Sequence, residues 1–219
     1  MSQKNIPPLL ASYLASLAAR PIYTKAVTSG SLLFVQEVLA NHLAGVQLRS
    51  GKASPVYTRA LSAAKIDLRA FKLAIYGFLV GGPLSHVLVS ALQKAFEGKD
   101  TPLYKILFLI ANNVLVAPVQ TAVYLASVAV IDGAKTPSAM LRVITSRILK
   151  VLRVTWVASP FAVLIAQRFL PMEYWVVWYN LVSFTLGLVA NVTAKAAKQK
   201  ALAAQDKKKD EKDSAARRN

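Results

Sequence analysis

The residues of this sequence that could do chemistry are ionisable and amide side chains inside long apolar segments. They are Gln36, Glu37, Asn41, His86, Asn112, Asn113 and Gln120. An ionisable group at membrane depth is costly and usually faces protein or water, so these residues could line a water-filled path. Alternatively, they bond to polar groups on neighbouring helices and hold the helices together.

Glu37 is the acidic residue that lies well inside an apolar segment, and Asn41 follows on the same helix face, four residues later. A water-filled path and a structural pairing explain Glu37 equally well. For His86, a hydrogen bond between helices is favoured over proton transfer. Asn112 and Asn113 could either join helices or line a cavity, and both alternatives stay open.

Enzyme chemistry has no recognisable pattern in this sequence. The chain has no cysteine and two histidines, which excludes a disulfide, a thiol nucleophile, a Cys-based zinc site and a histidine-rich metal site. It also lacks G-x-S-x-G, a phosphate-binding loop and HExxH. We therefore expect no catalysis, no cofactor and no metal.

The elements that must position these residues are membrane helices. Hydrophobic residues make up 55% of the 219 positions and charged residues 17%, a balance that soluble domains rarely have. A bilayer core takes about 20 residues of helix. Apolar segments of that length at 26–48, 73–96, 106–131 and 172–193 predict an all-α integral membrane protein, a bundle of about four transmembrane helices with additional interfacial amphipathic helices.

Small residues and prolines inside the expected spans indicate close helix packing or kinks. Gly77 and Gly81 form GxxxG, which lets a second helix approach, although the motif is also common by chance. A kink is expected where Pro83 follows Gly82. The residues expected to pack or kink helices are Gly77, Gly81, Gly82, Pro83 and Pro118.

The segments outside the four expected spans are expected to lie at the membrane surface. The segment 138–155 predicts a basic amphipathic helix with Arg142, Arg147, Lys150 and Arg153 on one arc. The segment 156–170, interrupted by Pro160, is expected to be a short re-entrant or half-buried piece. We therefore divide the chain into an N-terminal interfacial segment at 1–25, a transmembrane bundle at 26–194 and a basic tail at 195–219, disordered or a frayed solvated helix.

The net charge of +17 comes from loops and the tail, where a membrane protein places cations against anionic head groups. No nucleic-acid-binding signature accompanies it, so nucleic acid is not an expected partner. Four spans would put both termini on one side of the membrane. The cations divide fifteen to twelve between the two sides in that arrangement, which does not choose an orientation.

Several motifs occur in a recognisable order: Tyr23-Thr-Lys-Ala-Val-Thr-Ser-Gly30, Tyr76-Gly-Phe, Gly82-Pro-Leu-Ser-His86 and Ala117-Pro118. In these motifs the sequence resembles the Mpv-seventeen / peroxisomal-membrane-protein-twenty-two family over about residues 9–195. The residues of the motifs are most similar to the peroxisomal branch. The resemblance implies a small integral protein of the peroxisomal membrane, with the mitochondrial inner membrane as the alternative. Some members of this family are described as channels for small solutes.

Site residues follow from the same resemblance. The family's Gly-Asp pair in the first span falls on Gln36-Glu37, so acidity is retained there. Its Asp-Gln pair before Ala-Pro falls on Asn112-Asn113, which removes a charge. Departures around Trp156 and at Phe184-Thr-Leu-Gly-Leu188 fit a specialised paralogue, such as the filamentous-fungal type that self-assembles to sort Woronin bodies.

The first functional hypothesis is therefore a peroxisomal channel for small solutes. The alternative is a self-associating structural or sorting protein of the peroxisome with no transport activity. The partners expected in either case are the lipid bilayer, further copies of the chain and the peroxisomal membrane import receptor.

Overall fold

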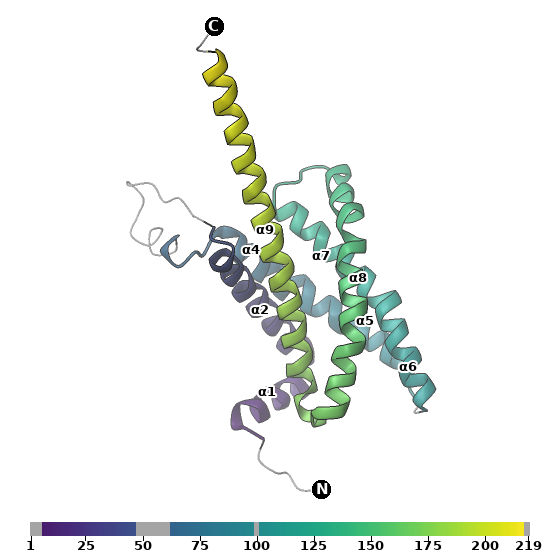
Figure 1. Ribbon diagram of the computed structural model, residues 1–219. Coiled ribbons are helices and arrows are strands. Elements are labelled where there is room, and N and C mark those ends of the chain that lie inside the picture. The colour runs from purple at the N-terminus through teal and green to yellow at the C-terminus, as the bar shows by residue number, and fades with distance from the viewer. Residues whose placement is uncertain (1–5, 47–61, 99–100, 217–219) are drawn as a thin grey trace.

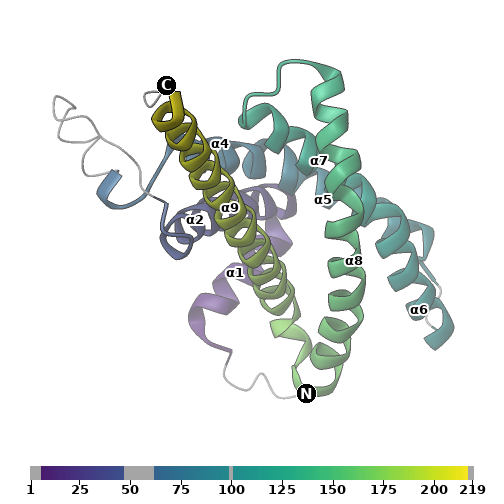
Figure 2. The same cartoon turned by 45° about the horizontal axis from the view of Figure 1, so that its top comes forward.

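The protein folds as a bundle of long helices (Figures 1 and 2). The computed structural model describes residues 6–46, 62–98 and 101–216, and this part contains helices and turns but no strand. The elements are α1 (Pro8–Ala19), α2 (Pro21–Leu43), α4 (Leu68–Tyr76), η1 (Gly77–Gly81), α5 (Gly82–Ala95), α6 (Pro102–Ala111), η2 (Asn112–Val116), α7 (Ala117–Ile131), α8 (Pro137–Phe169), η3 (Met172–Tyr174) and α9 (Trp175–Ala216).

The all-α membrane fold is confirmed, but the set of spans differs from the expected one. Four helical segments are long and apolar enough to cross a membrane: Leu68–Ala95, Ile106–Ile131, Pro137–Phe169 and Met172–Gln205. Three of them match expected spans. The first expected span, 26–48, is not among them, because its helix α2 carries too many polar residues.

Helix α8 corrects the prediction for 138–170. A surface helix followed by a broken piece was expected, but the structure has one continuous helix of 33 residues that includes Pro160. Arg142, Arg147, Lys150 and Arg153 are all exposed on its first half. At about 1.5 Å per residue the helix is about 50 Å long, which exceeds the roughly 30 Å hydrocarbon core, so one helix can cross the bilayer and still extend beyond it at its basic end.

Helix α2 lies at the centre of the bundle and packs against α4, η1, α5 and α9. Its neighbours bury seven of its residues, among them Gln36, Glu37 and Asn41. With 23 residues it is about 34 Å long, enough to run the length of the bilayer core. The buried face of α2 holds its polar residues against other helices, while Val27, Val35 and Leu39 are exposed on the rest of its surface, which is why α2 can be both central and polar.

Glycines bring α2 close to the helix that follows it. A Cβ atom on Gly77 would lie 2.8 Å from the Gly30 Cα, and one on Gly82 would lie 2.5 Å from the Ala26 Cα. Real Cβ atoms do not approach backbone so closely, so both glycines are required by the packing inside one chain. Gly81 differs, because a Cβ there would meet only the Ser29 hydroxyl, at 3.2 Å, and the Tyr76 ring.

The prolines expected to kink two helices follow π-helical segments. Pro83 comes just after η1 and Pro118 just after η2. In a regular α-helix the proline ring would collide with the carbonyl four residues earlier, at Leu79 or Val114. Both carbonyls lie within the wider π turns, which moves them away and keeps each helix continuous.

Helix α1 and the end of α9 lie at opposite ends of the bundle (Figure 1). Helix α1 sits beside the turn between α8 and α9, whereas α9 continues as a helix beyond the other elements to Ala216. The expectation of termini on one side came from four crossings. With α2 running alongside the four apolar rods, the described part of the chain passes along the bundle five times.

Candidate functional site

A buried ionic network joins four elements at the end of the bundle from which α9 projects. Glu37 of α2 is fully buried and accepts three bonds. Its Oε2 accepts from Arg69 Nη1 at 2.5 Å and from Asn191 Nδ2 at 2.6 Å, and its Oε1 accepts from Lys195 Nζ at 2.5 Å. One carboxylate therefore ties α2 to both α4 and α9.

The network continues on both sides of Glu37. Lys195 also donates to the Asn41 side-chain oxygen, and Asn41 Nδ2 donates to the Lys65 carbonyl at 2.9 Å. Arg69 Nε donates to Asp132 Oδ1 at 2.8 Å, just after the end of α7. Two carboxylates thus face two cations, and this balance offsets the large cost of taking charges out of water.

The other predicted residue of α2, Gln36, packs against α9. It is 6% exposed, and a Cβ on Gly187 would lie 2.6 Å from its Oε1. Because Gly187 has no side chain, the Gln36 amide occupies that space. Gln36 therefore fills a helix contact.

His86 lies elsewhere, in the contact between α2 and α5. Its Nδ1 is 3.5 Å from Lys25 Nζ. This placement agrees with the interpretation of His86 as a residue that joins helices. It lies on the second turn of α5, away from Glu37 near the other end of α2.

Asn113 joins η2 to α8. Its Nδ2 donates to the Leu109 carbonyl at 2.9 Å and to Ser159 Oγ at 3.3 Å, and its backbone oxygen accepts from Trp156 Nε1 at 2.9 Å. Asn112 and Gln120 are half-buried nearby on the same rod. Glu37 and Asn41 thus bond to α9, His86 lies beside Lys25 and Asn113 bonds to α8, so the structure does not bring the predicted polar residues together.

Four members of the network are not among the seven candidate polar residues, although Asn191 lies in the last expected span: Arg69, Asp132, Asn191 and Lys195. Arg69 was assigned to a loop, and Lys195 to the tail. One signal could have found part of the set. Asn191 and Lys195 are four residues apart, as are Glu37 and Asn41, so each helix presents a matching pair on one face.

The polar groups of the bundle are satisfied among themselves. In the part of the chain that the structure describes, no buried side-chain nitrogen or oxygen lacks a hydrogen-bond partner. Two pockets open on the surface beside α2, and none of the seven predicted polar residues lines either of them. Of these residues, Glu37, Asn41 and Asn113 donate or accept hydrogen bonds to groups on other elements.

The chain is similar to several fungal and plant membrane proteins. It is 38% identical to the Woronin body membrane protein wscA of Aspergillus fumigatus, over 88% of this chain and 79% of that protein. It is also 38% identical to the Woronin sorting complex protein of Neurospora crassa, over 85% of this chain but 57% of that protein. It is 26% identical to the peroxisomal membrane protein PMP22 of Arabidopsis thaliana, over 85% and 90% of the two chains.

No family model matches the sequence. No solved structure matches it either.

Proposed function

Because this chain belongs to the family of peroxisomal membrane proteins that includes PMP22 and the Woronin body membrane protein wscA, we propose that it is a structural and sorting protein of the peroxisomal membrane. The family resemblance carried by the sequence motifs is thereby confirmed, and the chain is a multi-pass peroxisomal membrane protein. In this role it associates with further copies of itself and helps to sort Woronin bodies. It reaches the membrane through the peroxisomal membrane import receptor.

The observation that carries this proposal is that Glu37 is buried and hydrogen-bonded to other helices. A channel needs polar groups that face water along a path, and Glu37 was the strongest candidate for such a group. Its oxygens accept bonds from Arg69, Asn191 and Lys195, and the side chain is fully buried. A carboxylate enclosed by its own partners supports a role in fixing helices rather than in conducting solutes.

The channel remains the second candidate because of the family resemblance. Proteoliposomes loaded with solutes of graded size distinguish the two functions, with empty liposomes and a pore-forming toxin as controls. We expect wild-type protein to release no more solute than the empty liposomes. Release that stops at a defined solute size would overturn the structural proposal in favour of the channel.

The sorting role has its own test in a relative. The chain would be expressed in an Aspergillus fumigatus strain that lacks wscA, with a fluorescent marker for Woronin bodies. We expect correct positioning of the marked bodies, and we expect the Glu37→Gln variant to restore it less well because the bundle is weakened. Correct peroxisomal insertion without any effect on Woronin bodies would count against a sorting role.

A further inference from the structure

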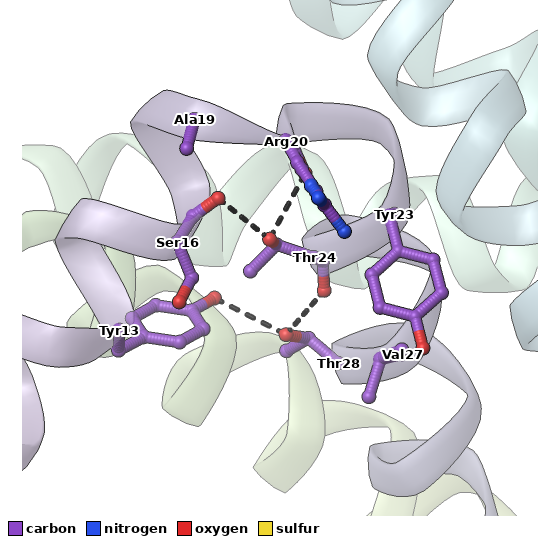
Figure 3. A pocket seen from close by; sticks show the side chains of 8 residues that line it. All are labelled: Tyr13, Ser16, Ala19, Arg20, Tyr23, Thr24, Val27 and Thr28. Atoms are coloured by element: carbon purple, nitrogen blue, oxygen red, sulfur yellow. Dashed lines mark hydrogen bonds between the residues drawn. The ribbon is translucent and has the colours of Figure 1, made fainter.

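A pocket of about 490 Å³ lies between α1 and α2, at their junction, and several of its lining side chains carry hydroxyl groups (Figure 3). Tyr13 Oη lies 3.3 Å from Thr28 Oγ1, and Thr24 Oγ1 donates to the Ser16 and Arg20 carbonyls at 2.9 Å. Arg20 lines the pocket from the turn between the helices and is exposed. Among the described residues its guanidinium forms no ion pair, so the pocket carries an uncompensated positive charge.

An apolar groove of about 750 Å³ continues from this pocket along α2. Val27 lines both hollows. Tyr23 of the pocket also touches Phe78 of the groove, edge to face, with 6.1 Å between ring centroids. Gly30 lies in the floor of the groove, and the walls are Phe34, Phe71, Ile75, Phe78 and Leu79.

The pocket and the groove together have the length of a lipid. From Arg20 to Phe34 the helix advances 14 residues, which is about 21 Å at 1.5 Å per residue. One leaflet with its head-group layer is half of about 40–45 Å, which is also about 21 Å. Arg20 lies at one end of this stretch of about 21 Å along α2, and the aromatic side chains of the groove line its other end.

The cationic end also lies at the correct level for a head group. Tyr13 Oη is 3.4 Å from Asn180 Nδ2 in the second turn of α9, so α1 and the start of α9 share one end of the bundle. Trp175, Trp178, Tyr174 and Tyr179 gather at that start. Such aromatic clusters mark the boundary between hydrocarbon and head groups.

We propose that this composite site binds one glycerophospholipid, with its phosphate at Arg20 and one acyl chain in the groove beside Val27, Phe34 and Phe78. Arginine pairs with phosphate through two parallel N–H donors, which suits a phosphate at Arg20. A second copy of the chain is the other occupant of the groove that the test distinguishes from a lipid. The site does not depend on the sorting role.

The test is native mass spectrometry of the full chain in mild detergent. Two probes would be titrated: dioleoyl phosphatidylglycerol, and dioleoylglycerol, which has the same chains without the phosphate. We expect one phosphatidylglycerol to stay bound per chain, more tightly than dioleoylglycerol. Arg20→Gln should weaken phosphatidylglycerol about tenfold, since one charge-assisted contact is lost, and should leave dioleoylglycerol unchanged.

A second variant tests the groove. Val27→Trp places a bulky ring at the junction of the two hollows and should displace both lipids, as should Ser31→Phe, which fills the groove from an exposed position. Matched controls are Arg168→Gln and Val157→Trp, both exposed on α8 and outside either hollow. Thermal unfolding would establish that each variant is folded.

Three results would overturn the proposal. In the first, Arg20→Gln and Arg168→Gln have the same effect on phosphatidylglycerol. In the second, folded Val27→Trp and Ser31→Phe keep the lipid. In the third, these groove variants leave lipid binding intact but abolish a dimer, which would assign the groove to a second copy of the chain.

Discussion

At the scale of single residues, Glu37 decides how the polar side chains of this protein are to be understood. Its burial would be prohibitive alone, but Arg69 and Lys195 supply opposite charge and Asn191 a further hydrogen bond. Removing one partner of such a network leaves the others buried and unpaired. The stability of the protein should therefore fall when one charge of the network is removed, and fall less when two opposite charges are removed together.

We predict that Glu37→Gln destabilises the bundle by about 3–5 kcal/mol, the usual cost of leaving a buried charge without its partner. The measurement is thermal or denaturant unfolding of the protein in detergent. Glu173→Gln is the control, because Glu173 is exposed at η3, and a change there should stay within about 0.5 kcal/mol. Equal stability of the Glu37 and Glu173 variants would contradict a structural network.

The double variant Glu37→Gln with Lys195→Gln should be more stable than the sum of the two single losses predicts. Removing both charges restores the balance, while Arg69 keeps Asp132 as its partner. A double-mutant cycle measures the coupling, expected at about 0.5–3 kcal/mol for groups in direct contact. Simple additivity would mean that Lys195 and Glu37 do not interact in the membrane.

At the scale of elements, the contact between α2 and the rod formed by α4, η1 and α5 depends on missing side chains. Gly82 faces the Ala26 backbone, whereas Gly81, one position earlier, faces a hydroxyl group that can turn away. The two glycines therefore offer a matched comparison. Replacing either by alanine brings the same gain in helix propensity, about 1 kcal/mol, so the difference between them reports packing.

We predict that Gly82→Ala destabilises the protein and that Gly81→Ala does not. A methyl group on Gly82 would force α2 away and should cost about 1–3 kcal/mol, as overpacking of a core does. Unfolding of the two variants in one detergent measures the difference. Because this contact lies within a single chain, the oligomeric state should not change, and loss of oligomers alone would point to a role between chains.

At the scale of the whole molecule, five passes along the bundle, in place of four, change how the lysines and arginines divide between its two ends. The described residues include twenty lysines and arginines, and fifteen of them fall in segments 62–72, 135–153 and 195–216, at the end that holds Glu37. The other end has five of the described ones. Positive residues accumulate in cytoplasmic connections, so the five-pass arrangement indicates that the end with Glu37 faces the cytosol. The four-span arrangement gave no such indication.

We predict that the tail faces the cytosol and that the segment before α1 faces the peroxisomal lumen. Epitope tags before residue 1 and after residue 219 would be tested in intact and permeabilised peroxisomes by protease digestion. The C-terminal tag should be digested in intact organelles, and the N-terminal tag only after permeabilisation. Digestion of both tags in intact organelles would restore the four-span arrangement.

The sequence by itself determined the membrane class, three of the four apolar spans and the family. These follow from composition, from apolar segment length and from motifs, which are local along the chain. It could not determine that the polar face of α2 is buried, that α8 continues through Pro160, or that Arg69 and Lys195 reach Glu37. Those facts depend on which helices are neighbours. Only the tertiary structure supplies the partners that make a polar helix stable inside the bundle, because the free energy of a buried charge depends on what surrounds it.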